Sequence, residues 1–227
     1  MNEAFIYTIR TETVRKADRS RLAELMPLRV QKSERFRFER DRLLCLGAGL
    51  LLLEVMKISD ERDILYTQYE KPYIPGGPAF SISHSGSCCI LACGEASTIG
   101  ADIEEIDETK IDVAPAVYTG AELAWMKQDP VERFFRLWTW KESVMKATGL
   151  GMNLAPQSFE VLPFTEGEPI RLFGKAWYAL GENTDGSCIS VCADEPIRHL
   201  RRTELTAASM RDSAISAFPR TESPWPA

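Results

Sequence analysis

The chain has 227 residues, of which 44% are hydrophobic and 26% are charged, a composition typical of a folded globular protein. Its longest apolar run, from Leu43 to Leu53, is far shorter than the roughly 20 residues that a membrane-spanning helix needs. The N-terminal residues lack the basic and then apolar arrangement of a secretory signal. We therefore expect a cytoplasmic protein that does not enter a membrane.

The charges are unevenly distributed along the chain. The net charge is −6, yet residues 1–42 hold 11 Lys and Arg against 7 Asp and Glu, so this segment carries +4 and the remainder −10. A basic segment on an acidic protein suits a small polyanionic ligand. It argues against general nucleic-acid binding, which needs a broad basic face. An ordinary solvated helix face explains the same charges.

The six cysteines include no CxxC pair, and the two histidines, His84 and His199, are far apart in sequence. We therefore expect neither a zinc site nor a disulfide framework. Several cysteines lie in apolar, strand-like runs, where this residue usually packs as a small core side chain.

In chain order, the loose alternation of residues 4–10 predicts a first strand, and residues 19–26 predict a short helix. Apolar residues at helical spacing predict a longer helix over residues 35–56. A loop rich in proline and glycine then leads into three short strands with hairpin-sized breaks, at residues 79–84, 88–93 and 97–104.

The second part of the chain repeats this order of helices and strands. Thr119 and Glu122 resemble a capping box, and a second helix is expected over residues 131–148, ended by Gly149 and Gly151. Four strands are then predicted, the last two joined by a Gly-Glu-Asn-Thr-Asp-Gly hairpin loop, at residues 159–162, 170–173, 175–180 and 188–193. The repeated order predicts an α+β fold of two α+β halves, residues 1–101 and 102–206, followed by a poorly ordered tail, 207–227.

Two acidic side chains mark the end of the strand at 97–104. Asp102 and Glu104 project from the same face, because side chains two residues apart in a strand point the same way. Neighbouring carboxylates repel unless they are solvated or share a cation, and Mg²⁺ prefers such oxygen ligands. An edge strand with its charges in water is the alternative.

The second helix carries a further acid and a base. Glu142 and Lys146 are four residues apart, so they lie on one helix face. They are either a surface ion pair or a third carboxylate for a metal ion together with a cation for a phosphate. Upstream, Ser83 and His84 end a strand, where they can donate hydrogen bonds to phosphate oxygens or cap the turn. They do not suit a nucleophile and base pair, because adjacent strand residues diverge.

The motifs KPYIPGGPAFSISHSG, GADIEEID and RLWTWKESVMKATGLGMNL follow one another in this order. The chain resembles the Sfp-type 4'-phosphopantetheinyl transferases, whose hallmarks are (G)xDxE and a tryptophan-containing KExxxK. These hallmarks stand here as Asp102 with Glu104, and as Trp140-Lys141-Glu142 with Lys146. The similarity is clear from about residue 29 to about residue 162.

The resemblance implies two pseudosymmetric α+β halves with coenzyme A in the cleft between them. It implies Mg²⁺, which Mn²⁺ could replace, held against the pyrophosphate by Asp102, Glu104 and Glu142. Catalytic roles would fall to Glu142 as the favoured base, with Glu104 the alternative, and to Lys146 and His84. The implied coenzyme A contacts are Arg29, Lys32, Lys71, Ser83, His84 and Lys146. The region of the first long helix that is expected to bind the 3'-phosphate departs from the family pattern. Its only basic residues nearby are Arg40 and Arg42.

The implied reaction moves 4'-phosphopantetheine from coenzyme A, the co-substrate, to a serine of an acyl or peptidyl carrier protein, with release of 3',5'-ADP. We expect a monomer that binds neither nucleic acid nor membrane. Two alternatives remain: a metal-dependent nucleotide phosphohydrolase, and a non-catalytic module that binds coenzyme A or a carrier protein.

Overall fold

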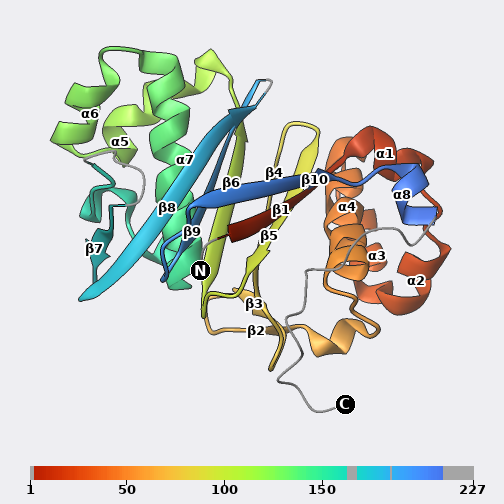
Figure 1. The fold of residues 1–227 in the computed structure, drawn as a ribbon. Helices are drawn as coiled ribbons and strands as arrows, with labels where there is room; N and C mark the ends of the chain where they lie inside the picture. The colour runs from red at the N-terminus through yellow and green to blue at the C-terminus, as the bar shows by residue number, and fades with distance from the viewer. Residues whose placement is uncertain (1–2, 163–167, 185, 212–227) are drawn as a thin grey trace.

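Two four-stranded sheets face each other between two groups of helices (Figure 1). The coordinates are a computed structural model, which describes residues 3–162, 168–184 and 186–211. The first sheet has the order β10-β1-β5-β4, formed by β1 (Glu3–Arg10), β4 (Ala79–Ser85), β5 (Cys88–Gly94) and β10 (His199–Glu204). The second has the order β6-β9-β8-β7, formed by β6 (Ile99–Glu105), β7 (Ile170–Leu172), β8 (Lys175–Thr184) and β9 (Ser187–Ala193).

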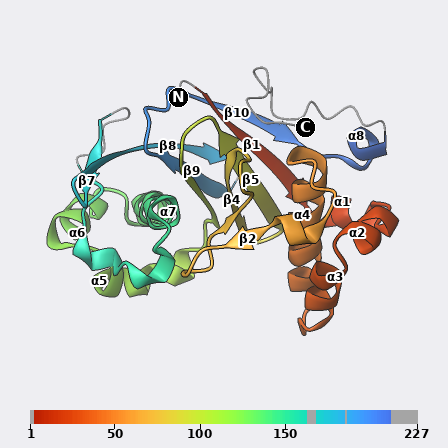
Figure 2. The same cartoon turned by 90° about the horizontal axis from the view of Figure 1, so that it is seen from below.

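Helices cover the outer face of each sheet, and the view from below shows α4 and α7 on opposite sides of the molecule (Figure 2). The helices on the side of the first sheet are α1 (Thr11–Lys16), α2 (Ser20–Leu25), α3 (Pro27–Glu34), α4 (Glu39–Val55) and α8 (Ala207–Arg211). Those on the side of the second are α5 (Ala114–Val117), α6 (Gly120–Met126) and α7 (Pro130–Thr148). A small hairpin of β2 (Leu65–Tyr66) and β3 (Pro72–Tyr73) connects α4 to β4.

The alternation of side chains along each strand separates three apolar cores. In β5, Ile90 and Ala92 belong to the core between the sheets, whereas Leu91 belongs to the core beneath α4. Successive strand residues point to opposite faces, so a strand buried on both faces is apolar throughout. In β6, Ile99 and Ile103 also lie between the sheets. The alternate residues of β6 are therefore directed toward α7.

Most of the predicted elements are confirmed. The expected strands at 4–10, 79–84 and 88–93 are β1, β4 and β5, and the expected helices at 35–56 and 131–148 are α4 and α7. The capping box is present, because Thr119 Oγ1 accepts from the Glu122 amide and Glu122 Oε2 accepts from the Thr119 amide. Gly149 ends α7 in the left-handed conformation, with φ 78°.

The strand predicted at residues 159–162 is wrong, and a buried ion pair explains why. Lys141 Nζ lies 2.9 Å from Glu122 Oε2, with neither side chain exposed to solvent. Lys141 also donates to the carbonyls of Pro156 and Phe159, at 2.7 and 2.6 Å, and the Val161 amide donates to Glu122. Backbone groups of this segment therefore form hydrogen bonds with the buried ion pair instead of with a neighbouring strand.

The sequence analysis misplaced one hairpin loop and missed three strands, β2, β3 and β10. The loop predicted at 181–186 is largely strand, because β8 continues to Thr184 and pairs with β9 up to Ser187. Of the missed strands, β10 lies parallel to β1, with Glu3 opposite His199. The boundary expected at residue 101 falls inside β6 and stays a prediction, as does the tail, of which residues 212–227 lie outside the described part.

All six cysteines are free thiols, and five are buried. Burial raises the pKa of Cys93 to about 12 and that of Cys188 to about 11, so both are protonated at neutral pH. No helix in the described ranges is long and apolar enough to cross a membrane.

Gly100 allows α7 to lie directly on β6. A Cβ atom there would overlap the backbone of Ser143 and Ala147, with the Ala147 Cα at 2.9 Å. We expect Gly100→Ala to lower the free energy of unfolding by about 1–3 kcal/mol, measured by urea denaturation, because two backbones must separate. Gly120→Ala is the matched control, since a Cβ at Gly120 meets nothing within 4 Å. Equal stability of the two variants would contradict this packing.

Candidate active site

The candidate site lies where the edge strands of the two sheets meet beneath α7. β4 and β6 are neighbours, and α7 packs on β6. Lys146 connects all three elements: its Nζ lies 2.7 Å from Asp102 Oδ1 of β6 and donates to Ser83 Oγ of β4 at 2.9 Å. Ser83 Oγ in turn donates to Asp102 Oδ1 at 2.7 Å. The predicted Ser83, Asp102 and Lys146 therefore form one hydrogen-bonded cluster.

Glu142 and Glu104 flank this cluster. Glu142 Oε2 lies 3.9 Å from Lys146 Nζ, one helical turn away. Burial raises the pKa of Glu142 to about 7; Lys146 opposes this shift, and Asp102 and Glu104 add to it. Burial, and then the charge of Asp102, also raise the pKa of Glu104, while hydrogen bonds from Ser85 and Trp138 oppose the rise. The three carboxylates are therefore close enough to interact electrostatically.

One observation favours a cation at these carboxylates. Asp102 is only 3% exposed, and its Oδ2 atom is buried without a hydrogen-bond partner, whereas Oδ1 has two. A buried acceptor that lacks a donor is costly, and a hard cation would satisfy it. Within the described residues, no three potential ligands already converge. Mg²⁺ fits the donor set nonetheless, because it commonly takes one or two carboxylates and completes its shell with phosphate oxygens and water.

His84 lies on the opposite face of β4 from Ser83. It alternates with Phe80 and Ile82, which pack in the core beneath α4, but its own side chain is exposed. Partial burial and then the charge of Lys146 lower the pKa of His84 from its ordinary value, which favours the neutral ring. A neutral imidazole near a lysine can still donate one hydrogen bond to an anion.

A pocket of about 200 Å³ opens beside the cluster. It is lined by Lys71, Lys146, Phe80 and Ser81, together with the loop residues around Tyr69 and Gly149. Lys71 Nζ donates to Thr98 Oγ1 at 2.7 Å and to the Ala147 carbonyl at 3.1 Å, near the C-terminus of α7. Two lysines therefore border one pocket, which suits an anionic ligand.

Lys71 should give the protein a specific pH dependence. Burial lowers its pKa from 10.5 to about 8. The folded protein therefore binds the Lys71 proton less tightly than the unfolded chain does. The contribution of Lys71 to the free energy of unfolding should consequently rise as the pH increases from 8 to 10.5. This gain should be absent once the pH has fallen through 8. Urea unfolding at several pH values should show a gap between wild type and Lys71→Met that changes over this window. A constant gap would contradict the assignment.

Comparison with known proteins identifies the family of the chain. Residues 98–192, which include the carboxylates and Lys146, match the 4'-phosphopantetheinyl transferase superfamily. Over 155 residues the chain is 32% identical to the 4'-phosphopantetheinyl transferase Sfp of Bacillus subtilis (strain 168), covering 63% of this chain and 69% of that protein. The chain belongs to this superfamily.

Other relatives are similar over shorter shares of their length. The 4'-phosphopantetheinyl transferase gsp of Aneurinibacillus migulanus is 36% identical over 114 residues, covering 48% of this chain and 47% of that protein. The L-aminoadipate-semialdehyde dehydrogenase-phosphopantetheinyl transferase of Xenopus laevis is 30% identical over 167 residues, covering 62% and 55%. The chain thus spans about half the length of these two transferases.

In this transferase, Arg29 and Lys32 are placed apart from the carboxylates. Both lie on α3, which packs on α4. Arg29 is half-buried against Gly49, and its Nε atom is buried without a hydrogen-bond partner, while Lys32 is exposed. Among the described residues, neither forms a hydrogen bond or ion pair with the carboxylates of the site, and their role toward a ligand stays a prediction.

The sequence did not single out two serines of β4. Ser81 and Ser85 alternate with Ser83, and both form hydrogen bonds with β6. Their period of two within Ser81-Ile-Ser-His-Ser85 was the signal that would have identified them.

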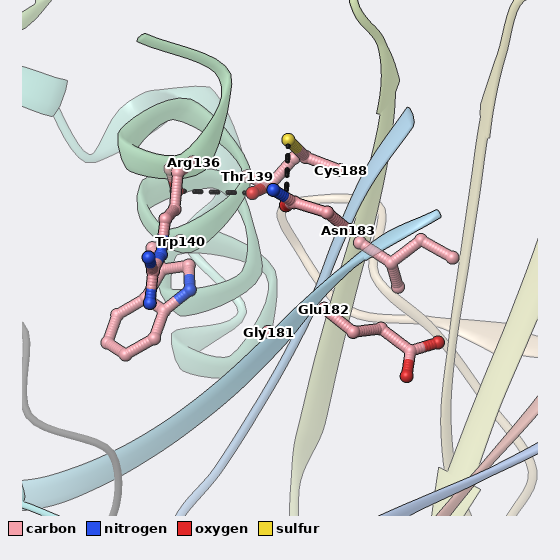
Figure 3. A pocket seen from close by; sticks show the side chains of 8 residues that line it. Arg136, Thr139, Trp140, Gly181, Glu182, Asn183 and Cys188 are labelled. Carbon is pink, nitrogen blue, oxygen red and sulfur yellow. Dashed lines mark hydrogen bonds between the residues drawn. The ribbon is translucent and has the colours of Figure 1, made fainter. Parts of the chain in front are cut away.

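A second pocket lies elsewhere in the transferase, between α7 and the strands β8 and β9 (Figure 3). It measures about 180 Å³, and Arg136, Trp140 and Glu182 are among its lining residues. At its wall, Cys188 Sγ donates to Asn183 Oδ1 at 3.3 Å. None of the predicted site residues lines this pocket, so it is separate from the candidate active site.

Proposed function

We propose that this transferase moves 4'-phosphopantetheine from coenzyme A to a serine hydroxyl of a carrier protein and releases 3',5'-ADP. The observation that carries the proposal is the Lys146 cluster, in which one ammonium contacts Ser83 of β4 and Asp102 of β6. This cluster combines an ammonium group, a hydroxyl and a carboxylate at the junction of the two sheets, beside a pocket bordered by two lysines. Phosphoryl transfer needs positioning and charge neutralisation of this kind.

In the proposed reaction, the serine oxygen of the carrier attacks the β-phosphorus, and the bond to the oxygen that bridges to the α-phosphate breaks. Negative charge then develops on 3',5'-ADP, where Lys146 and His84 would stabilise it. Ser83 would contact a phosphate oxygen by turning toward it the proton that it donates to Asp102 in the cluster. Lys71 would bind the nucleotide end in its pocket, with Arg29 and Lys32 as further candidate cations.

The serine proton needs an acceptor. We assign this role to Glu142, directly or through a water, because burial raises the pKa of its carboxyl to about 7 when no cation is bound. A cation held by Glu142 would lower this pKa, and the water route would then apply. Glu104, the alternative, has a pKa that is also raised. Asp102 is the more suitable cation ligand, because its Oδ2 atom lacks any other partner.

Asp102, Glu104 and Glu142 would hold Mg²⁺, or Mn²⁺ in its place. When bound, this ion supplies charge neutralisation at the pyrophosphate. A cytoplasmic monomer that binds neither nucleic acid nor membrane stays our expectation from the sequence. Fatty-acid, polyketide, nonribosomal-peptide and aminoadipate-reducing carriers are all candidate partners.

Mass spectrometry tests the proposal. The purified protein is incubated with coenzyme A, Mg²⁺ and a panel of apo-carrier proteins. The expected result is a carrier that gains the mass of one phosphopantetheine, with release of one equivalent of 3',5'-ADP. Release of 3',5'-ADP without carrier modification would indicate a hydrolase, and absence of both products would indicate a binding module. Either result would overturn the proposal.

A further inference from the structure

Three serines of β4 connect the two sheets. Ser81, Ser83 and Ser85 alternate along the strand, so their side chains share the face toward β6. β4 and β6 are edge strands of different sheets. Hydrogen bonds through serine hydroxyls join them: Ser81 to Ala101, Ser83 to Asp102, and Ser85 to Glu104 and Glu105.

The first and last of these serines accept hydrogen bonds from the backbone of β6. The Ala101 amide donates to Ser81 Oγ at 2.9 Å, and the Glu105 amide donates to Ser85 Oγ at 3.0 Å. A hydroxyl has one proton to donate and two lone pairs to accept with, so each serine retains the capacity for a second bond. These two bonds fix β4 and β6 in register at two positions, on either side of the Asp102 cluster.

Of the two serines that accept from the backbone of β6, Ser85 also donates to a carboxylate of the site. Its Oγ donates to Glu104 Oε2 at 2.8 Å while it accepts from the next amide of β6. Ser81 makes the backbone bond without a carboxylate bond. A comparison of Ser81 with Ser85 can therefore distinguish an effect on strand register from an effect on the position of the carboxylate.

The hydroxyl of Ser85 restrains the orientation of the Glu104 carboxylate. Asp102 and Glu104 project from the same face of β6, and Ser85 Oγ donates to Glu104 Oε2 at 2.8 Å. The Glu105 amide, which donates to the same Ser85 Oγ at 3.0 Å, fixes the position of that hydroxyl. Loss of the Ser85 donor would therefore leave Glu104 with fewer restraints that keep it beside Asp102.

We propose that Ser85 is a positioning residue, which holds the Glu104 carboxylate beside Asp102 so that both can bind one divalent cation. The role of the cation in this inference rests on the proposed function. The geometry rests on the hydrogen bonds between β4 and β6. Ser81, by contrast, contributes to strand register and not to the position of a carboxylate.

Direct binding of Mn²⁺, followed by electron paramagnetic resonance with coenzyme A present, tests the proposal without reference to turnover. We expect Ser85→Ala to weaken Mn²⁺ binding by about 10-fold or more, as for other residues that orient metal ligands. Ser85→Thr keeps the hydroxyl and should restore binding. Ser81→Ala should have a smaller effect. Ser87→Ala is the control, because this exposed serine of the β4–β5 turn forms none of these bonds.

Two further measurements separate positioning from loss of structure. Amide hydrogen exchange at Glu105 should accelerate in Ser85→Ala and exchange at Ala101 in Ser81→Ala. In carrier modification, Ser85→Ala should raise the Mg²⁺ concentration for half-maximal rate while KM for coenzyme A changes less than about twofold.

The outcomes distinguish this inference from the proposed function. Wild-type-like Mn²⁺ binding by Ser85→Ala, in a protein that modifies carriers, would overturn the inference alone. A Ser85→Ala defect in Mn²⁺ binding, in a protein that modifies no carrier, would overturn the proposed function alone. Failure of the wild type to bind Mn²⁺ would overturn the inference and the proposed metal site together.

Discussion

Replacing Lys146 by alanine should lower kcat/KM for carrier modification by about 10²–10³-fold, the effect of removing one preorganised donor from a developing negative charge. Lys146 contacts both Ser83 and Asp102, so no other side chain of the cluster can supply its charge from the same position. The measurement is the initial rate of phosphopantetheine transfer at subsaturating coenzyme A, with circular dichroism as the check of the fold.

Two variants control this experiment. Lys146→Gln retains a donor for Ser83 without the charge, so it should lose activity while keeping more stability than Lys146→Ala. Lys175→Ala removes an exposed lysine at the start of β8 and should leave transfer unchanged. Transfer by folded Lys146→Ala at wild-type rates would remove Lys146 from the mechanism.

The second large effect is expected on stability. Lys141→Met should lower the free energy of unfolding by about 3–5 kcal/mol, because Glu122 would remain as an uncompensated buried charge. Lys141 also donates to the Pro156 and Phe159 carbonyls, which would lose their partner. Adding Glu122→Gln to this variant should recover part of the loss, because the buried charge is then gone. Urea denaturation measures both.

An exposed ion pair provides the comparison. Arg202 and Glu182 lie 3.4 Å apart, with side chains 47% and 35% exposed. Solvent screens such a pair, so Arg202→Ala should cost about 1 kcal/mol or less. If Lys141→Met were no more harmful than Arg202→Ala, the burial of the Glu122–Lys141 pair would be contradicted.

Local periodicity predicted much of the architecture. A period of two placed Asp102 and Glu104 on one face of β6, and a period of 3.6 placed Glu142 and Lys146 on one face of α7. The sequence alone did not show that these faces meet. That expectation came from the family resemblance, and the contact of Lys146 with Asp102 confirms it for this pair.

Tertiary interactions decided what periodicity missed. Residues 199–204 are mostly exposed and polar, so no apolar pattern indicated β10. This strand exists because β1 offers it an edge to pair with. Residues 159–162 have the apolar content of a strand, but Lys141 and Glu122 use backbone groups of that segment. Neither interaction is visible within a short window of sequence.

The parallel pairing of β1 with β10 has a consequence for biosynthesis. β1 is translated before its neighbour β10, in which His199 lies opposite Glu3, and most of the described residues separate the two strands. Until then, one side of β1 has unpaired amide and carbonyl groups, which can template association with another nascent chain. Contacts between such distant positions also slow folding. The first sheet of this transferase is therefore completed only after β10 has been translated.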